Sequence, residues 1–248
     1  MKIISIANRK GGAGKTTTAI NLSVALVRKG KKVLVLDMDP QANLTFAFGI
    51  KPATGSIVHV LHAVHAIHAL RVNKEGVDIV PSEKQLADVE LELAGKIGRE
   101  SILKNSIATL SGYDYIFIDC PPSLGLLTIN ALNASDYVLV PTQMEVLALQ
   151  GLAQLFDTVY EVKQILNSKL EIIGIIPFMY DERRNLSAEI LAEIQKNVKE
   201  RIFKTVVREC VKIAEAPSFE KSVLAYAPSS HGAEDFTNLA KEFLSLRS

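Results

Sequence analysis

The sequence contains no tryptophan, only two cysteines and no long apolar run, and each absence narrows the classes of protein that it can encode. No stretch approaches the roughly 20 apolar residues of a membrane-spanning helix. Cys120 and Cys210 offer no spaced disulfide framework, and Cys120 ends an apolar run where a buried, reduced thiol is expected. The first residues run into a glycine-rich segment too soon for a secretory leader. We therefore expect a cytoplasmic protein.

An excess of charge of either sign is also missing. Lysine and arginine number 28 against 27 aspartates and glutamates, which gives a formal net charge of +1. The chain is not basic overall, so its net charge does not indicate a nucleic-acid partner. Any surface that binds nucleic acid must be a local basic patch or one assembled by dimerisation. With 48% hydrophobic residues in 248, the chain has ample material for a buried core.

The apolar residues gather in short continuous runs that alternate with helical stretches. Continuous rather than alternating runs are typical of strands covered on both faces. The pattern predicts an α/β fold with a doubly wound, mainly parallel sheet and helices on both faces. No long linker or repeat interrupts it, so we expect a single domain over residues 1–248. The expected strands are 3–7, 33–36, 77–81, 115–118, 137–141 and 172–178, and the expected helices include 16–29, 83–95, 100–110 and 231–246.

A glycine-rich segment, Lys10 to Thr17, lies between the first expected strand and the first expected helix. Its glycines let backbone N–H groups approach an anion closely, and the following helix adds its positive N-terminal dipole. Lys15 can then reach the β- and γ-phosphates, and the Thr16 hydroxyl can ligate Mg²⁺. The ordinary phosphate loop has a glycine where this sequence has Arg9. The segment is instead the deviant Walker A form, with an additional lysine, Lys10, at its head. The predicted phosphate-binding residues are Gly11, Gly12, Ala13, Gly14, Lys15, Thr16 and Thr17.

Acidic residues follow two other expected strands. Asp119 comes directly after one of them, as a Walker B acid does, and is placed to hold Mg²⁺ together with Thr16. Asp37 and Asp39 end the strand 33–36, so that one can face the metal and the other an attacking water. Carboxyl ends of parallel strands share one edge of a sheet, where ligands bind. The sequence therefore predicts a site for ATP and Mg²⁺ at this edge, with Thr16, Asp37 and Asp119 as the candidate metal residues.

Taken together, these motifs resemble those of the ParA/Soj partition ATPases of the MinD/ParA superfamily. The resemblance spans nearly the whole chain and follows the same order. It is carried by Lys10 to Thr17, 37–43, Asp119 to Gly125, Pro141 to Leu152 and Ala214 to Ser218.

The resemblance implies a nucleotide-gated homodimer and assigns roles to three residues. Lys15 binds phosphates within its own subunit, Lys10 reaches across to the partner's phosphates, and Asp39 orients the water. It further implies slow ATP hydrolysis, an ATP-bound dimer that binds non-specific DNA on the nucleoid, and a ParB-like protein that stimulates hydrolysis. The cargo would be a chromosome or a plasmid.

Two basic residues match positions that contact DNA in relatives. Arg183 matches one such position, and Lys212 stands where relatives usually have arginine. Lysine keeps the charge but loses the bidentate fork, which a non-specific phosphate contact tolerates. The alternative for both residues is an ordinary solvated surface charge.

Two alternative functions would each require features of their own in the sequence. A membrane-surface ATPase like MinD would need a tail suited to lipid, but the helix 231–246 lacks a lysine-rich polar face, so we expect it to pack against the domain and expect no stable membrane association. A metal-cluster carrier or a relative of nitrogenase reductase would need more than Cys120 and Cys210.

Histidines recur at every third position from His59 to His68. Such a series drifts around a helix axis, so only two members at a time could share a metal ion. We expect instead one helix with an apolar face of Val58, Leu61, Val64 and Ile67 and half-exposed histidines.

Overall fold

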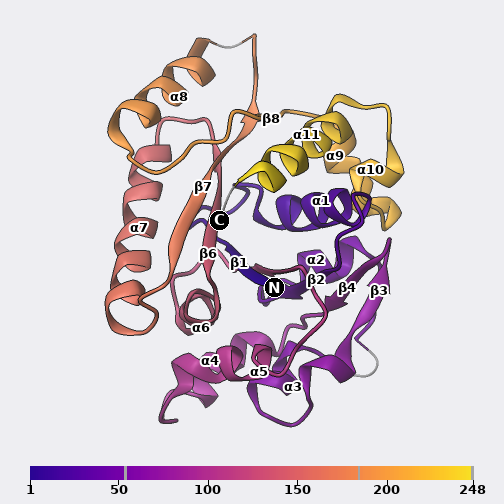
Figure 1. The fold of residues 1–248 in the computed structure, drawn as a ribbon, viewed down its shortest axis with the longest axis vertical. Coiled ribbons are helices and arrows are strands. Elements are labelled where there is room, and N and C mark those ends of the chain that lie inside the picture. Colours follow the sequence, from indigo (N-terminus) through magenta and orange to yellow (C-terminus); the bar gives the residue numbers. More distant parts are fainter. Residues whose placement is uncertain (53–54, 184, 247–248) are drawn as a thin grey trace.

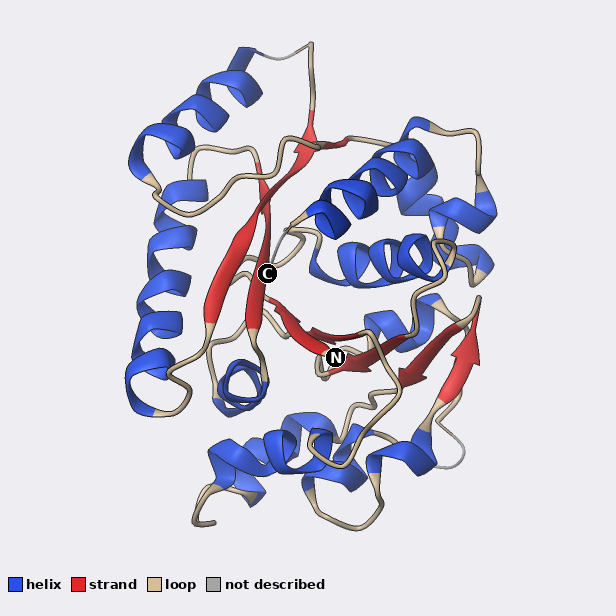
Figure 2. Ribbon diagram, in the orientation of Figure 1, coloured by secondary structure: helices blue, strands red, loops and turns tan. Residues whose placement is uncertain are grey.

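The structure is a computed structural model that describes residues 1–52, 55–183 and 185–246. In this part of the chain eight strands form one sheet in the order β3-β4-β2-β5-β1-β6-β7-β8, with helices on both sides (Figures 1 and 2). The strands are β1 (Lys2–Ile6), β2 (Val33–Asp37), β3 (Val72–Lys74), β4 (Val77–Val80), β5 (Tyr115–Asp119), β6 (Tyr137–Gln143), β7 (Glu171–Tyr180) and β8 (Val207–Arg208).

Helices fill most of the chain between the strands. The α-helices are α1 (Lys15–Val27), α2 (Asn43–Ala47), α3 (Ile57–Leu61), α4 (Leu86–Glu92), α5 (Ile102–Ile107), α6 (Leu126–Ala134), α7 (Ala148–Ile165), α8 (Asn185–Asn197), α9 (Val211–Glu215), α10 (Val223–Tyr226) and α11 (His231–Ser245). Short 3₁₀ turns are η1 (Ile67–Leu70), η2 (Arg99–Ser101) and η3 (Ala216–Phe219).

The predicted doubly wound, mainly parallel sheet is confirmed. All neighbouring strands pair in parallel except β3, which lies antiparallel to β4 at one edge. All six expected strands form, with ends that shift by a few residues. The sequence analysis missed β3 and β8, which are only 3 and 2 residues long and therefore carry no apolar run of strand length.

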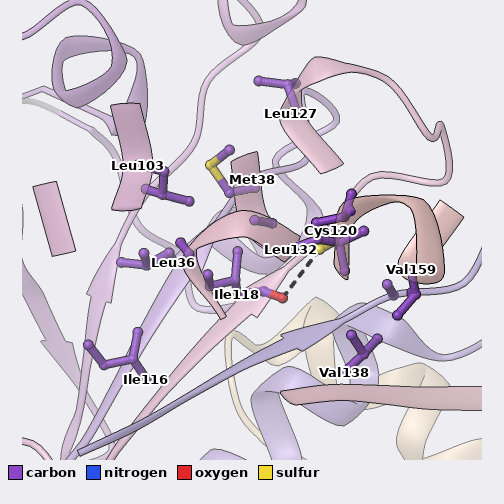
Figure 3. Packing of buried hydrophobic residues seen from close by; sticks show 14 of the residues in the cluster. Leu36, Met38, Leu103, Ile116, Ile118, Cys120, Leu127, Leu132, Val138 and Val159 are labelled. Carbon is purple, nitrogen blue, oxygen red and sulfur yellow. Dashed lines mark hydrogen bonds between the residues drawn. The ribbon is translucent and has the colours of Figure 1, made fainter. Parts of the chain in front are cut away.

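Two hydrophobic cores form, one on each face of the sheet. One lies between the sheet and the group α1, α2, α10 and α11, and the other lies under α3 to α8. Figure 3 shows part of the second core, which includes Leu36 of β2, Ile118 of β5, Cys120 just after β5, Leu103 of α5, and Leu127 and Leu132 of α6. Because both faces are covered, the central strands are apolar at successive positions, which explains their continuous runs.

The C-terminal helix α11 packs against α1 and the sheet, as predicted. Phe236 and Leu239 are fully buried and Phe243 is 4% exposed. The ring of Phe243 meets Tyr115 and Phe117 of β5 with centroids 5.4 and 5.9 Å apart. The apolar stripe of this helix therefore lies in the core. Within the described residues, no helix is both long and apolar enough to cross a bilayer.

The expected histidine helix is wrong in its length. Helix α3 begins after Ser56, whose hydroxyl accepts from the Val58 N–H, and ends at Leu61. Ala63 then takes a left-handed conformation with φ of 58°, which turns the chain, and Val64 is 62% exposed instead of lying on an apolar face. Among the described residues, no group of three or more histidine, cysteine or acidic side chains is arranged to hold a metal by itself.

Candidate nucleotide site

The glycine-rich loop joins the end of β1 to the start of α1. Gly12 and Gly14 have φ of 77° and 92°, a region that side chains with a Cβ rarely adopt. Gly14 also packs so closely against the Phe178 ring that a Cβ at this position would lie 2.5 Å from a ring carbon. The left-handed turn at Gly14 starts α1, so that the helix N-terminus faces the loop.

Lys15 is held at the base of the loop. Its side chain is buried, and Nζ donates to the carbonyl oxygen of Lys10 at 3.1 Å. Burial lowers the pKa of Lys15, and the charges of Asp119 and Asp39 act in the opposite direction. An ammonium group in this position would attract an anion that binds in the loop.

The two predicted metal-side acids stand on adjacent strands in register. Asp37 of β2 and Asp119 of β5 are direct partners in the parallel pairing, and Asp119 is also level with Ile6 of β1. The Thr16 hydroxyl donates to Oδ2 of Asp119 at 2.7 Å. Oδ1 of Asp119 is buried and has no hydrogen-bond partner within the described residues. A cation or a cation-bound water at this oxygen would satisfy it, so Thr16 and Asp119 fit a magnesium ion.

Burial raises the pKa of both carboxyl groups. The pKa of Asp37 rises to about 6, although hydrogen bonds from Thr45 oppose the rise. The pKa of Asp119 rises well above its usual range because of its burial and the neighbouring Asp37. Two carboxylates this close and this buried disfavour each other's charge, so the site favours positive charge between them.

Asp39 lies two residues beyond the end of β2. It is 7% exposed and lines the large cavity described below. Its Oδ1 accepts from the Gln41 N–H at 2.9 Å, and its own N–H donates to Oδ1 of Asp37 at 3.2 Å. The carboxyl group is thus fixed relative to its main chain and to Asp37.

The structure separates Lys10 from the other predicted site side chains. Its Nζ pairs with Glu145 and contacts Oε1 of Gln143 at 3.3 Å, both at the end of β6. The Lys10 side chain is 44% exposed. Asn8 joins the same two elements, since its Nδ2 donates to the Pro141 carbonyl at 2.8 Å and its Oδ1 accepts from the Lys10 N–H at 3.0 Å.

A cavity of about 780 Å³ begins at the loop and extends toward β7, β8 and α9. Asp39 lines it, as do six of the seven residues of the predicted phosphate loop: Gly11, Gly12, Gly14, Lys15, Thr16 and Thr17. Further lining comes from Gln41, Asn43, Phe46, Phe178, Met179, Arg208, Glu209, Cys210, Pro217 and Lys221.

No single residue of this second set was predicted as a site residue, although Gln41, Asn43 and Pro217 lie in segments that carry the resemblance. The lining residues lie far apart in the sequence and have no motif spacing, so only the fold brings them together. Gln41 and Asn43 belong to the segment after the two acids, which is the one signal that the sequence offers for them.

The two predicted DNA-contact residues each pair with an acid of the same chain. The Arg183 guanidinium meets both carboxylate oxygens of Asp181, at 3.0 and 3.2 Å. Lys212 Nζ contacts Glu215 at 2.8 Å and lies 5.8 Å from the centre of the Tyr226 ring. Both side chains remain at the surface, where a phosphate would have to compete with these carboxylates.

A glycine-rich loop between a buried strand and a helix, with a threonine and a strand-end aspartate beside it, defines a P-loop nucleotide-binding protein of the α/β class. A family model described as an AAA domain matches residues 1–172. The chain is 46% identical over 246 residues to the sporulation initiation inhibitor protein Soj of Bacillus subtilis, and 97% of each chain is covered. The chain therefore belongs to the ParA/Soj family.

Solved structures agree in fold. A protein from Mycobacterium smegmatis described as a cobyrinic acid a,c-diamide synthase, with a bound ATP analogue and magnesium, has a TM-score of 0.87 and 34% identity. That comparison covers 98% of this chain and 94% of the other. A putative plasmid partition protein from Borrelia burgdorferi bound to AMPPNP has a TM-score of 0.82 and 30% identity, with 98% of each chain covered.

Proposed function

We propose that this protein is an ATP-dependent dimerising switch that binds DNA non-specifically and hydrolyses ATP slowly to drive chromosome or plasmid partition. One observation carries the proposal, namely that the two loop lysines occupy different surroundings. Lys15 is buried at the base of the loop, whereas the Lys10 side chain lies at the surface beside β6. Within its own subunit, the exposed Lys10 side chain has no assigned role in the site. In a dimer it could reach the phosphates bound by the second subunit.

ATP would occupy the cavity with its phosphates on the loop. The N–H groups of Gly11 to Thr17 and the Lys15 ammonium would hold the phosphates, and the base would lie toward Phe178 and Pro217. Thr16 and Asp119, with Asp37 behind them, would hold Mg²⁺. The ion would neutralise charge on the β- and γ-phosphates. Magnesium-bound and AMPPNP-bound relatives of the same fold support this arrangement.

Hydrolysis requires a positioned water and charge stabilisation. Asp39 is the acid that remains for the water, because Asp119 bonds Thr16 and Asp37 bonds Thr45. Lys10 of a second subunit would stabilise the charge on the transferred phosphoryl group, as an arginine finger does. An isolated subunit lacks that contribution, so we expect slow turnover that a ParB-like partner accelerates.

DNA binding would depend on the assembled dimer. The chain has a net charge of only +1, and Arg183 and Lys212 are each paired with an acid. Doubling the surface beside a dimer seam would bring four such cations together. Phosphate contacts of this kind carry no base specificity and weaken with salt. In the cell, the ATP-bound form would then lie on the nucleoid.

The test is DNA retention by purified protein with ATP, with ADP and without nucleotide. We expect retention only with ATP. Lys10→Ala should still bind ATP but lose retention, and Lys212→Glu should lose retention with nucleotide binding unchanged. Lys169→Glu, which changes an exposed lysine just before the amino-terminal end of β7, away from the carboxyl ends of the strands that carry the site, is the matched control. Retention without ATP, or full retention by Lys10→Ala, would overturn the proposal.

A further inference from the structure

Ser82, two residues after the end of β4, lies beneath the segment that carries Asp39. It is 1% exposed, and its hydroxyl donates to the carbonyl oxygen of Asp39 at 2.8 Å. The nearest pairing in the sheet is Leu36 of β2 with Val80 of β4. The parallel register therefore delivers Ser82 beside the chain that leaves β2.

The main chain of Ser82 is tied to the other acid of the same segment. Its N–H donates to Oγ1 of Thr45 at 2.8 Å, and that hydroxyl donates to Oδ2 of Asp37 at 2.7 Å. The Thr45 N–H donates to the same oxygen at 2.9 Å. Thr45 is 4% exposed, so these hydrogen bonds are buried. We call the set that joins Ser82, Thr45, Asp37 and the Asp39 carbonyl the relay.

The relay holds Asp39 from two sides. Its N–H is bonded to Asp37, and its carbonyl accepts from both Ser82 and the Ala42 N–H, the latter at 2.9 Å. Buried hydrogen bonds of this kind fix a backbone because breaking them leaves polar groups without water. The Asp39 side chain is in turn bonded to the Gln41 N–H. The position of the Asp39 carboxylate therefore depends on its main chain, and the main chain depends on Ser82.

We propose that Ser82 is a positioning residue for ATP hydrolysis: its hydroxyl holds the Asp39 carbonyl, its main-chain N–H holds Thr45 against Asp37, and together they keep the Asp39 carboxylate in place. The inference rests on the proposed function, because Asp39 must orient the attacking water. Ser82 itself lies below the cavity rather than in its lining. It should therefore affect the hydrolysis rate and leave nucleotide affinity alone.

The kinetic test compares Ser82→Ala, Asp39→Ala and the double variant. Small displacements of a catalytic group cost up to about 100-fold in rate, so we expect Ser82→Ala to lower kcat by roughly 10- to 100-fold with an unchanged Kd for ATP. In the Asp39→Ala background, Ser82→Ala should cause no further loss, because its effect passes through Asp39. An equal further loss in that background would overturn the inference, and so would an unchanged kcat in the single variant.

Two further variants separate positioning from folding. Ser135→Ala removes another buried hydroxyl, bonded to Ser5 and Ala131, and should leave kcat unchanged. If Ser82→Ala does not fold, Thr45→Val and Thr45→Ser take its place. Thr45→Val removes the hydroxyl that links the two halves of the relay and should lower kcat, whereas Thr45→Ser retains the hydroxyl and should restore it. Equal kcat in these two variants would overturn the inference.

A measurement without ATP distinguishes failure of this inference from failure of the proposed function. Amide hydrogen exchange in the nucleotide-free protein reports the hold on residues 39–42 directly. Ser82→Ala should accelerate exchange at Gln41 and Ala42, with exchange at the phosphate loop unchanged. Unchanged exchange at 39–42 would overturn the positioning role, whereas a wild-type protein that hydrolyses no ATP would overturn the proposed function alone.

Discussion

Asp119 is a fully buried carboxyl group whose charged form the protein holds at an energetic cost. Its pKa is raised well above the ordinary value of 3.8 by burial and by Asp37. The protonated carboxyl is therefore favoured by the folded state. Its contribution to stability is fully present below pH 3.8 and is lost as the pH rises through the folded pKa. Asp37, with a folded pKa of about 6, adds a loss in the same direction between about pH 4 and pH 6.

Asp119→Asn should therefore stabilise the nucleotide-free protein at neutral pH. The amide keeps an oxygen to accept from Thr16 and removes the buried charge. We expect the melting temperature to rise by roughly 2–4 °C for each kcal/mol gained at pH 7.5, with a smaller gain at pH 5. The same variant should lose magnesium-dependent ATP binding. Thermal melting at the two pH values measures the first effect, and a variant less stable at pH 7.5 would contradict it.

At the scale of elements, the contact between β7 and the phosphate loop decides which residue can stand at the start of α1. Gly14 combines φ of 92° with the Phe178 ring at contact distance. Gly11 has open space around its Cβ position. The two glycines of one loop are therefore under different constraints.

Gly14→Ala should destabilise the protein, whereas Gly11→Ala should not. The first variant combines backbone strain of about 1–3 kcal/mol with a clash against Phe178. We expect a clear drop in the melting temperature of nucleotide-free Gly14→Ala and loss of nucleotide binding. Phe178 is itself a buried core ring, so the double variant is compared with Phe178→Ala alone, and Gly14→Ala should cost less in that background than in the wild type. Equal melting temperatures for the two alanine variants would show that the contact is unimportant.

At the scale of the whole molecule, the pairing of Lys10 with Glu145 competes with any second subunit for the same ammonium. Both side chains are partly exposed, at 44% and 30%, so the pair contributes at most about 1 kcal/mol. Dimerisation that uses Lys10 in trans must break it.

Glu145→Gln should therefore favour ATP-dependent self-association. Each of the two subunits gives up one such pair, so a gain of up to about 2 kcal/mol per dimer corresponds to an apparent dimer Kd up to roughly 30-fold lower. Sedimentation velocity with a non-hydrolysable ATP analogue measures the shift. Glu161→Gln, which removes an exposed carboxylate from α7, is the control and should leave the dimer Kd unchanged. Weaker association of Glu145→Gln would indicate that Glu145 itself contacts the partner.

The sequence by itself determined the layered α/β architecture and the nucleotide loop of this protein. Continuous apolar runs specify strands buried on both faces, and the loop motif places its chemistry within eight consecutive residues, where local order is enough. It also determined that Asp37 and Asp119 would share one sheet edge, because parallel strands end together. The histidine segment shows the limit, since a single left-handed residue at Ala63 ended a helix that the spacing had favoured.

Only the tertiary structure decided what surrounds those motifs. The register that sets Asp37 opposite Asp119, the Phe178 ring against Gly14 and the Ser82 hydroxyl beneath Asp39 all join residues distant in sequence. Strand order and register fix such pairs, and neither leaves a periodic signal along the chain. The tertiary structure also decided the surroundings of Lys10. Because β6 ends beside the head of the loop, the Lys10 side chain is exposed and pairs with Glu145.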